Sequence, residues 1–365
     1  MQFTILRQNL KSALDNVRTT VRTNPHVEWS KMLKFHVSPV DSSITAYDLD
    51  TGIISTIDVS TMESAEFLVE PDKLSALVSK LTDDMVSFDL DWNTMTLTIK
   101  CGRSKSKVLV QSADSFPCIP DADSQTSITM SCSEFAEAVR QTVFAVAQND
   151  NKPVLKGELF EVADNTLTVS AIDGYRLAVK KTAVSTADNY RLIIKGDTLK
   201  AVAKLAKDGE IILYPSRKHV VFGLGRNKIF TRLLEGEFVD YRRTVDAPHT
   251  SEAIVNTSDL IEVLDRFTLM TDSKAKAPAR CVFGNGKIDL SIKSAHGEMS
   301  DCIDIDYSGP EVTIGINVYF LLDALKASES DKVKLQLNGG LAPMKILPLD
   351  GNSYVFVVLP VRLKD

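Results

Sequence analysis

Apolar and polar positions alternate along this chain in a pattern that occurs three times. Short runs in which every second residue is apolar predict strands, and apolar residues at helical spacing follow each run and predict an amphipathic helix. One set of strand–helix pairs is expected at 2–5 with 10–17, 127–130 with 135–143, and 252–255 with 260–269. A second set is expected at 67–69 with 74–81, 192–194 with 199–205, and 312–314 with 320–327. Equivalent strands start about 125 residues apart, which indicates an internal repeat.

Local signals indicate where these elements begin and end. Four short segments between alternating runs predict β-hairpin turns: Asp91-Trp92-Asn93, Asp164-Asn165, Asn285-Gly286 and Asp350-Gly351-Asn352. Acidic or hydroxyl residues lie where a helix N-cap would accept backbone N–H bonds, namely Asp72, Asp197 and Ser258-Asp259. Each third is therefore predicted to contain a strand, a helix and further strands, and then the same arrangement again.

These elements predict an α+β protein of three tandem, topologically similar domains. We expect the domains at 1–122, 123–246 and 247–365. Two helices in each domain would pack together on antiparallel sheets. Three such domains in one chain would form an arc with helices on one side and sheet on the other.

Composition narrows the class of protein. The chain has 365 residues, of which 44% are apolar and 25% charged, as in an ordinary globular protein. Its 42 basic and 48 acidic residues give a net charge of −6, so a nucleic-acid partner would need local positive charge. Five irregularly spaced cysteines favour reduced thiols in the cytoplasm: Cys101, Cys118, Cys132, Cys281 and Cys302. No signal peptide and no apolar run of about 20 residues is found, so no membrane partner is expected.

Basic residues recur on one face of the expected helices. Helical spacing aligns Lys11 with Arg18, Lys73 with Lys80, and Lys200 with Lys204 and Lys207. The remaining expected helices each add one basic residue, namely Arg140, Arg266 and Lys326. For a single helix, a solvated polar face explains such residues well enough. Their recurrence in an acidic protein favours a surface that binds an anionic polymer.

The width of a helix limits what such an arc could enclose. A helix is about 10–12 Å wide, so two per domain line roughly 22 Å of arc. Three domains closed into a ring would leave a hole of only about 10 Å, whereas six would leave about 30 Å. Duplex DNA is about 20 Å across, given its groove dimensions. A closed homodimer is therefore the smallest ring that could surround a duplex, with its cations meeting phosphates rather than bases.

Several motifs resemble those of the bacterial sliding clamps, the beta subunits of DNA polymerase III. Two of them are specific when they occur together: Asp173-Gly174-Tyr175-Arg176-Leu177 and Pro360-Val361-Arg362-Leu363. The segments 234–243, 114–117 and 314–318 also resemble this family, and the similarity covers essentially the whole chain. The resemblance implies a DNA polymerase processivity factor, without catalysis of its own, that acts in DNA replication. Its two protomers would close head to tail around double-stranded DNA, in a cytoplasmic and nucleoid-associated location.

The resemblance also implies a pocket between the second and third domains that binds short peptides of the replicative polymerase, clamp loader and repair proteins. The matching positions are Leu155, Ile172, Gly174, Tyr175, Arg176, Leu177, Val239, Arg243, Asn317, Phe320, Leu341, Pro343, Val357, Leu359, Pro360, Val361 and Arg362. Aliphatic side chains would hold the apolar anchors of the peptide, and Arg176, Arg243 and Arg362 would border the groove. Without the resemblance, Leu155, Leu177 and Leu359 would be assigned to an ordinary core.

A head-to-tail interface is expected between the first and third domains. The alternating run 104–110 is a candidate edge strand, with Lys105 and Lys107 on one face and Ser106 and Val108 on the other. By family correspondence, Ser106 and Val108 face Leu269 and Met270 of the partner protomer. A second strand-like run at 301–306 is acidic and includes Asp304 and Asp306. Opposite charges at two sheet edges would favour their pairing.

The chain departs from the family pattern at some positions. Asn24 replaces a DNA-contacting Arg of some members, with Arg18 and Arg22 nearby as candidate contacts, and Tyr175 stands where His is frequent. A clamp-like scaffold that binds peptides but not DNA is therefore an alternative. An enzyme is the other alternative, but no metal-ligand spacing of His and no H-E-x-x-H, G-x-S-x-G or P-loop motif occurs. We expect no catalytic residue, no metal and no cofactor.

Overall fold

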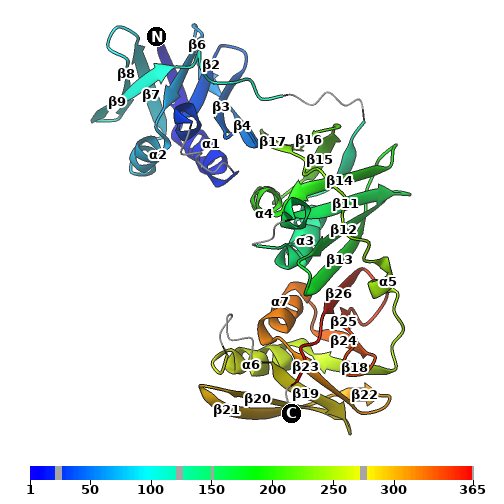
Figure 1. Cartoon of the computed structure of the whole chain (residues 1–365). Helices are drawn as coiled ribbons and strands as arrows, with labels where there is room; N and C mark the ends of the chain where they lie inside the picture. Colours follow the sequence, from blue (N-terminus) through cyan, green and yellow to red (C-terminus); the bar gives the residue numbers. More distant parts are fainter. Residues whose placement is uncertain (21–26, 121–125, 149–151, 272–277, 364–365) are drawn as a thin grey trace. The chain divides into compact units, whose positions relative to one another are not determined.

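A computed structural model of the chain describes residues 1–20, 27–120, 126–148, 152–271 and 278–363 (Figure 1). The chain separates into two compact units. Unit 1 comprises 1–135, 185–187 and 201–233, and unit 2 comprises 136–184, 188–200 and 234–365. No helix among the described residues is long and apolar enough to cross a membrane.

Unit 1 holds a sheet of 13 strands in the order β10-β15-β16-β17-β4-β3-β2-β6-β9-β8-β7-β1-β5. The strands from the first third of the chain are β1 (Gln2–Leu6), β2 (Leu33–Val37), β3 (Ser42–Tyr47), β4 (Thr51–Ile57), β5 (Val59–Ser60), β6 (Ala65–Val69), β7 (Met85–Asp91), β8 (Thr96–Cys101) and β9 (Ser104–Ser112). Those from the second third are β10 (Ile128–Ser131), β15 (Glu210–Pro215), β16 (His219–Leu224) and β17 (Asn227–Arg232).

Unit 2 holds a sheet of nine strands and one of four. The larger sheet has the order β14-β11-β12-β13-β26-β25-β24-β18-β22, and the smaller has the order β21-β20-β19-β23. Second-third strands here are β11 (Gly157–Ala163), β12 (Thr166–Ile172), β13 (Arg176–Ala183) and β14 (Tyr190–Lys195). The others are β18 (Ser251–Asn256), β19 (Ala279–Gly284), β20 (Lys287–Ser294), β21 (Gly297–Asp304), β22 (Asp306–Ser308), β23 (Val312–Ile316), β24 (Lys332–Leu337), β25 (Met344–Leu347) and β26 (Tyr354–Val358).

All six predicted strand–helix pairs are confirmed. The helices that follow their strands directly or after one residue are α1 (Arg7–Thr20), α2 (Pro71–Ser79), α3 (Cys132–Thr142), α4 (Gly196–Leu205), α6 (Thr257–Thr268) and α7 (Val318–Ser328). A further short helix, α5 (Arg242–Val245), lies between β17 and β18 in the chain. Helix α1 contacts α2, and α6 lies beside α7 (Figure 1), as expected for two helices packed together in one domain.

The predicted N-caps are wrong. Asp72, Asp197 and Asp259 lie in the first turns of α2, α4 and α6, and a residue at or just after the end of the preceding strand takes the cap position. At most one residue separates each strand from the helix that follows, so the N-cap position falls before the predicted residues, at Glu70 for α2 and at Asn256 for α6. A carboxylate in the first turn still stabilises the positive end of the helix dipole.

At two of the predicted hairpin turns, the backbone has the conformation that the residue types indicate. Asp164 and Asn165 have φ of 49° and 55°, and Asn285 and Gly286 have φ of 52° and 73°. Two successive positive φ values define the turn whose twist matches paired strands, and Asn, Asp and Gly tolerate that conformation best. Both turns join directly paired residues, as the sequence indicates.

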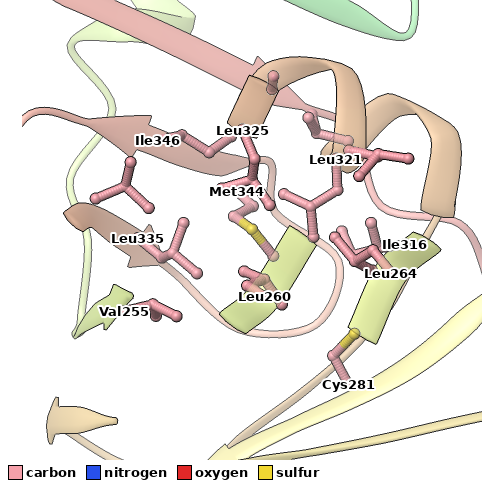
Figure 2. Close-up of a cluster of buried hydrophobic side chains, with 14 of the residues drawn as sticks. Val255, Leu260, Leu264, Cys281, Ile316, Leu321, Leu325, Leu335, Met344 and Ile346 are labelled. Carbon is pink, nitrogen blue, oxygen red and sulfur yellow. The ribbon is translucent and has the colours of Figure 1, made fainter. Parts of the chain in front are cut away.

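The third domain shows how the helices are attached to the sheets. Figure 2 shows Leu260 and Leu264 of α6 and Leu321 and Leu325 of α7 meeting side chains from the strands of unit 2. All four leucines are buried. The thiol of Cys281 lies in the same cluster, and burial raises its pKa to about 12, so this cysteine is chemically inert at neutral pH.

Strand pairing repeats three times. Each third contains two three-stranded antiparallel meanders: β2–β3–β4 and β7–β8–β9, then β11–β12–β13 and β15–β16–β17, then β19–β20–β21 and β24–β25–β26. The strand that precedes each of the helices α1, α2, α3, α4, α6 and α7 pairs with the first strand of a meander. All six of these pairs are antiparallel. The internal repeat expected from the sequence is therefore a repeat of topology.

One carboxyl group is fully buried at the base of α3. The side chain of Glu158 on β11 has no exposed surface, and its Oε2 accepts a 2.6 Å hydrogen bond from the Thr142 hydroxyl. Its other oxygen, Oε1, has no partner among the described residues. Burial raises the pKa of Glu158 to about 8, against a weaker opposing effect of the Thr142 bond. Glu158 is therefore largely protonated at neutral pH.

This burial predicts how stability changes with pH. The folded state holds a proton on Glu158 that the unfolded state has lost, so stability falls as pH rises from about 4.5 to about 8. Glu158→Gln mimics the protonated acid and should remove this dependence. We expect the urea midpoints of variant and parent to be similar near pH 5, and the variant to be more stable near pH 9 by a few kcal/mol. A constant difference across that range would contradict the assignment.

Candidate functional sites

The predicted basic residues that the structure describes are all exposed. They are Lys11 and Arg18 of α1, Lys73 of α2 and Lys80 at its end, Arg140 of α3, Lys200 and Lys204 of α4, Lys207 just after α4, Arg266 of α6 and Lys326 of α7. Arg22 and Asn24 lie outside the described residues. Each described cation therefore meets the first requirement of a surface that contacts an anionic polymer.

Six of these ten cations are paired with carboxylates. The pairs are Lys11 with Asp15, Arg18 with Asp72, Lys73 with Glu70, Arg140 with Glu329, Arg266 with Asp301 and Lys326 with Asp265, at N···O distances of 2.6–3.2 Å. Exposed pairs of this kind are weak and exchange readily, so they lower the local charge without fixing it. Only the pairs Lys11–Asp15 and Lys73–Glu70 are close enough in sequence to be anticipated from helical spacing; the other four join residues far apart in the chain.

The other four cations are Lys80, Lys200, Lys204 and Lys207. Within the described residues, no carboxylate lies within 4.0 Å of their ammonium groups. Lys204 and Lys207 line a hollow of about 660 Å³ together with Arg18 of α1. Asn16 and Asn227 also line it and are joined by a 3.3 Å hydrogen bond. Among the predicted cations, the four lysines without a carboxylate partner in the described part of the chain are therefore the most available to bind a phosphate.

A second site is built where β13 pairs with β26 in unit 2. Leu177 lies opposite Val357 in this pair, although the two residues are 180 positions apart in the sequence. Both are buried, and they form one apolar cluster with Leu155, Phe238 and Tyr241. The two aromatic residues belong to residues 238–247, which we call the connecting segment. Ile172 packs against the same cluster from β12. The structure thus brings together four apolar positions of the predicted pocket, Leu155, Ile172, Leu177 and Val357.

Several of the predicted pocket positions are exposed apolar side chains. Six large apolar side chains are exposed among the described residues of unit 2, and four belong to the predicted pocket. They are Tyr175 (57% exposed), Val239 (41%), Leu341 (80%) and Leu359 (37%). These exposed side chains are available for contact with a partner.

The turn between β12 and β13 fixes the position of Tyr175. Gly174 has a φ of 88°, a conformation that favours glycine. The Oδ1 atom of Asp173 accepts hydrogen bonds from the backbone N–H groups of Tyr175 and Arg176 at 2.9 and 3.0 Å. The Tyr175 ring stacks on the Phe320 ring of α7, with centroids 6.0 Å apart. Asp173-Gly174 therefore forms a structural turn that positions Tyr175.

Arg176 is a structural link and does not border the groove as a free cation. Its Nε donates to Asp173 at 2.9 Å, and its Nη1 donates to Asp323 of α7 at 2.5 Å. Its guanidinium carbon lies 4.7 Å from the Phe320 ring centroid and 5.5 Å from that of Phe144. The side chain is only 11% exposed. Charge and stacking together hold β13 against α7.

The C-terminal segment completes the site. The Leu359 N–H donates to the Tyr175 carbonyl at 2.9 Å, and the Val361 N–H donates to the Gly315 carbonyl at 2.8 Å. A Cβ atom at Gly315 would lie 2.3 Å from the Val361 carbonyl oxygen, so only glycine permits this approach. Pro360 is half-buried and Arg362 is exposed. The tail residues Lys364 and Asp365 lie outside the described residues.

The remaining predicted pocket residues have varied positions. Asn317 caps α7, accepting hydrogen bonds from the backbone N–H groups of Tyr319 and Phe320. Pro343 is half-buried in the loop that leads into β25, and Arg243 is exposed on α5. Asn317 therefore positions the first turn of α7, while Arg243 and Arg362 are the exposed cations of the predicted pocket.

Five of the predicted interface residues lie on two sheet edges: Lys105, Ser106, Lys107 and Val108 on β9, and Asp304 on β21. Residues 104–109 of β9 pair only with β8, because β9 pairs with β6 through 110–112 alone. Strand β21 is the edge of the four-stranded sheet. Lys105 and Lys107 are exposed, and Ser106 and Val108 are half-buried, as the alternation predicts. Among the described residues, no further strand pairs with either edge, so both could pair with a strand of another chain.

One part of the interface prediction needs correction. The run 301–306 is not one strand, because β21 ends at Asp304 and Asp306 begins β22, which pairs with β18 in the other sheet of unit 2. Near the end of α6, Leu269 is 74% exposed and Met270 is half-buried. Leu109 at the edge of β9 is 75% exposed and was missed by the sequence analysis. Leu109 lies in the alternating run 104–110, so the same pattern could have identified it.

Family models and known proteins match the chain along its length. The models of the DNA polymerase III beta subunit match in order: the N-terminal domain at 1–120, the central domain at 129–240 and the C-terminal domain at 243–362. Beta sliding clamps of Synechococcus elongatus and Haemophilus influenzae are each 26% identical to the chain. The match covers 99% of the chain and 99% of the Synechococcus protein, and all of the chain and all of the Haemophilus protein.

Solved structures give the same result. A putative DNA polymerase III beta subunit from Eubacterium rectale is 28% identical, with a TM-score of 0.94, and the match covers 100% of both chains. The DNA polymerase sliding clamp of Bacillus subtilis shares the fold at 24% identity, with a TM-score of 0.95 and 100% coverage of both chains. With three clamp domains matched in order, the chain belongs to the DNA polymerase III beta subunit family, the sliding clamps, and is a non-catalytic processivity subunit.

Proposed function

We propose that two copies of this chain close head to tail into a ring around duplex DNA and recruit polymerase and repair proteins through the β13–β26 pocket. The observation that carries the ring is the pairing between meanders. The last strand of a second meander pairs with the last strand of a first meander: β17 with β4, and β26 with β13. Each of these pairs joins one domain to the domain before it.

This rule of pairing last strands leaves two strands without such a partner among the described residues: the last strand of one second meander and the last strand of one first meander. Strand β9 ends the second meander of the first domain, and β21 ends the first meander of the third domain. Applied once more, the rule pairs β9 of one protomer with β21 of another. Two protomers joined in this way at both ends make a closed ring of six domains, and no edge remains for a third copy.

Charge and apolar area support this pairing. Strand β9 carries Lys105 and Lys107, whereas β21 carries Glu298, Asp301 and Asp304. Opposite charge at the two edges favours this pairing over that of identical edges. Leu109 and Leu269 expose apolar area near the respective edges, which the pairing would bury.

The DNA contact would be electrostatic and independent of sequence. Lysines and arginines on the helices would meet phosphates without reading bases, which permits sliding along the duplex. Because six of the ten described cations have carboxylate partners, the unpaired lysines at α2 and α4 are expected to contribute most. Association with DNA would also give the protein a nucleoid location.

The pocket suits a short peptide with apolar anchors. Each buried anchor would contribute about 1.5–3 kcal/mol, and ordering of the peptide would offset much of that gain. We therefore expect affinities in the micromolar range, which allow partners to exchange. Polymerase, clamp loader and repair proteins would then compete for one site on each protomer.

We predict topological linkage to DNA. Protein loaded on a nicked circle should remain there, and linearising the circle should release it. Retention on the linear product with free ends would contradict encirclement. Lys200→Glu with Lys204→Glu should reduce loading or retention more at low salt than at high salt, because salt screens these contacts. If the intact ring binds peptides but cannot be loaded on any circle, a peptide-binding scaffold is the better description.

We predict that the dimer depends on the segment after α6. Leu269→Ala with Met270→Ala removes apolar area from the proposed contact and should yield monomers in sedimentation experiments at micromolar concentration. Leu349→Ala, a change at another exposed leucine of unit 2, is the matched control and should leave the dimer intact. A double variant that sediments like the parent would exclude this interface.

We predict that peptide binding is separable from ring formation. Leu359→Ala with Val361→Ala removes apolar atoms from the C-terminal segment, at a cost of a few kcal/mol shared between folding and binding. The variant should remain dimeric but bind a clamp-binding peptide at least tenfold more weakly, as measured by fluorescence anisotropy. Deletion of 359–365 should abolish binding and processive synthesis. Unchanged affinity in the double variant would mean that the pocket lies elsewhere.

A further inference from the structure

We propose that Lys345 is a positioning residue for the peptide pocket: its buried side chain holds the connecting segment, residues 238–247, against the apolar floor of the site. This inference rests on the proposed peptide-binding function. Lys345 was not among the pocket positions indicated by the sequence. Its role follows from the register of four strands and from the two backbone groups that it contacts.

The floor of the pocket is a row of directly paired residues. Ile172 of β12 lies opposite Leu177 of β13, Leu177 lies opposite Val357 of β26, and Val357 lies opposite Lys345 of β25. Directly opposed residues share one face of a sheet. The Lys345 side chain therefore continues the apolar row on the face that carries Leu177 and Val357.

The ammonium group of Lys345 binds the end of the connecting segment. Its Nζ donates to the Ala247 carbonyl at 2.6 Å and to the Val245 carbonyl at 3.3 Å. Lys345 as a whole is only 8% exposed. A buried ammonium is tolerated only when hydrogen bonds replace water, so these two bonds are needed to keep the lysine in this place. Both acceptors lie at the end of α5, where carbonyl groups lack helical partners.

The connecting segment is anchored at its other end by aromatic rings. Phe238 and Tyr241 are buried in the cluster with Leu177 and Val357, and Val245 packs against that cluster. Val239 and Arg243, the predicted pocket residues on this segment, are both exposed. Their positions therefore depend on anchors at the two ends. Phe238 and Tyr241 supply the first anchor, and Lys345 supplies the second.

Charged groups around Lys345 determine its response to pH. Burial lowers the pKa of Lys345, and the Asp246 carboxylate on the connecting segment opposes that effect. Tyr241 on the same segment titrates at higher pH than usual because it is buried. On the strands, Gln336 lies opposite Lys345 and binds Glu252 at 3.2 Å. Lys345 should thus lose its proton at a lower pH than an exposed lysine, and a neutral amine makes weaker hydrogen bonds.

The test compares Lys345→Met with Lys332→Met in the full-length dimer. Methionine keeps most of the length of the side chain but cannot donate to the two carbonyls. Lys332 lies on the neighbouring strand β24 and is exposed, so it is a matched control. The probe is a short labelled peptide with two or three leucine anchors and no titratable side chain, and its affinity is measured by fluorescence anisotropy between about pH 7 and pH 10.

We expect Lys345→Met to weaken peptide binding at least fivefold at neutral pH and to remain dimeric. Backbone amides of 238–247 should exchange hydrogen faster in this variant, while those of β25 and β26 should not change. The affinity of the parent should fall as pH rises through the titration of Lys345, and that step should be missing in Lys345→Met. Lys332→Met should behave like the parent in every measurement.

Two results would overturn the inference. One is a Lys345→Met protein that binds the peptide within twofold of the parent and has unchanged exchange at 238–247. The other is faster exchange throughout β25 and β26, which would mean that Lys345 supports the fold of the domain as a whole. A parent that fails to bind any such peptide would instead overturn the proposed function, and this inference with it.

Discussion

Unpaired backbone groups at the edges of sheets are the constraint on which the rest of this structure depends. A meander of three strands leaves its last strand with a row of free N–H and C=O groups. Here the strands β4 and β13 satisfy theirs by pairing with β17 and β26, which come from the following domain. Each sheet thereby continues from one domain into the next. The edges at β9 and β21 have no such partner among the described strands, and we propose that they pair with each other between two copies of the chain.

The same pairing forms the floor of the proposed peptide site. Leu177 and Val357 are neighbours only because β13 pairs with β26, and the Tyr175 carbonyl then accepts the N–H of Leu359. Arg176 joins this seam to α7 through Asp323 and two aromatic rings. The site is built from segments about 180 residues apart and needs this rigidity. If the two strands were held loosely, each binding event would lose free energy in ordering them.

The sequence predicted the repeated elements well because periodicity and turn residues are local signals. Positions such as Leu177 and Val357 were found through resemblance to a family. What the sequence could not supply were contacts set by tertiary pairing. The partners of Asp323 and Lys345 are far away in sequence, so no local pattern indicates their contacts. The role of Arg176 changed for the same reason, since its partners Phe144 and Phe320 are distant in sequence.

The charge pattern explains how an acidic protein can act on an acidic polymer. Carboxylates next to Arg18, Arg140 and Arg266 lower the positive potential of the helices without removing the cations. A duplex phosphate could displace an exposed carboxylate at little cost, since such pairs contribute about 0–1 kcal/mol. The resulting hold on DNA would be weak at every point. Weak contact suits a clamp whose retention comes from ring closure, because strong contact would slow sliding along the duplex.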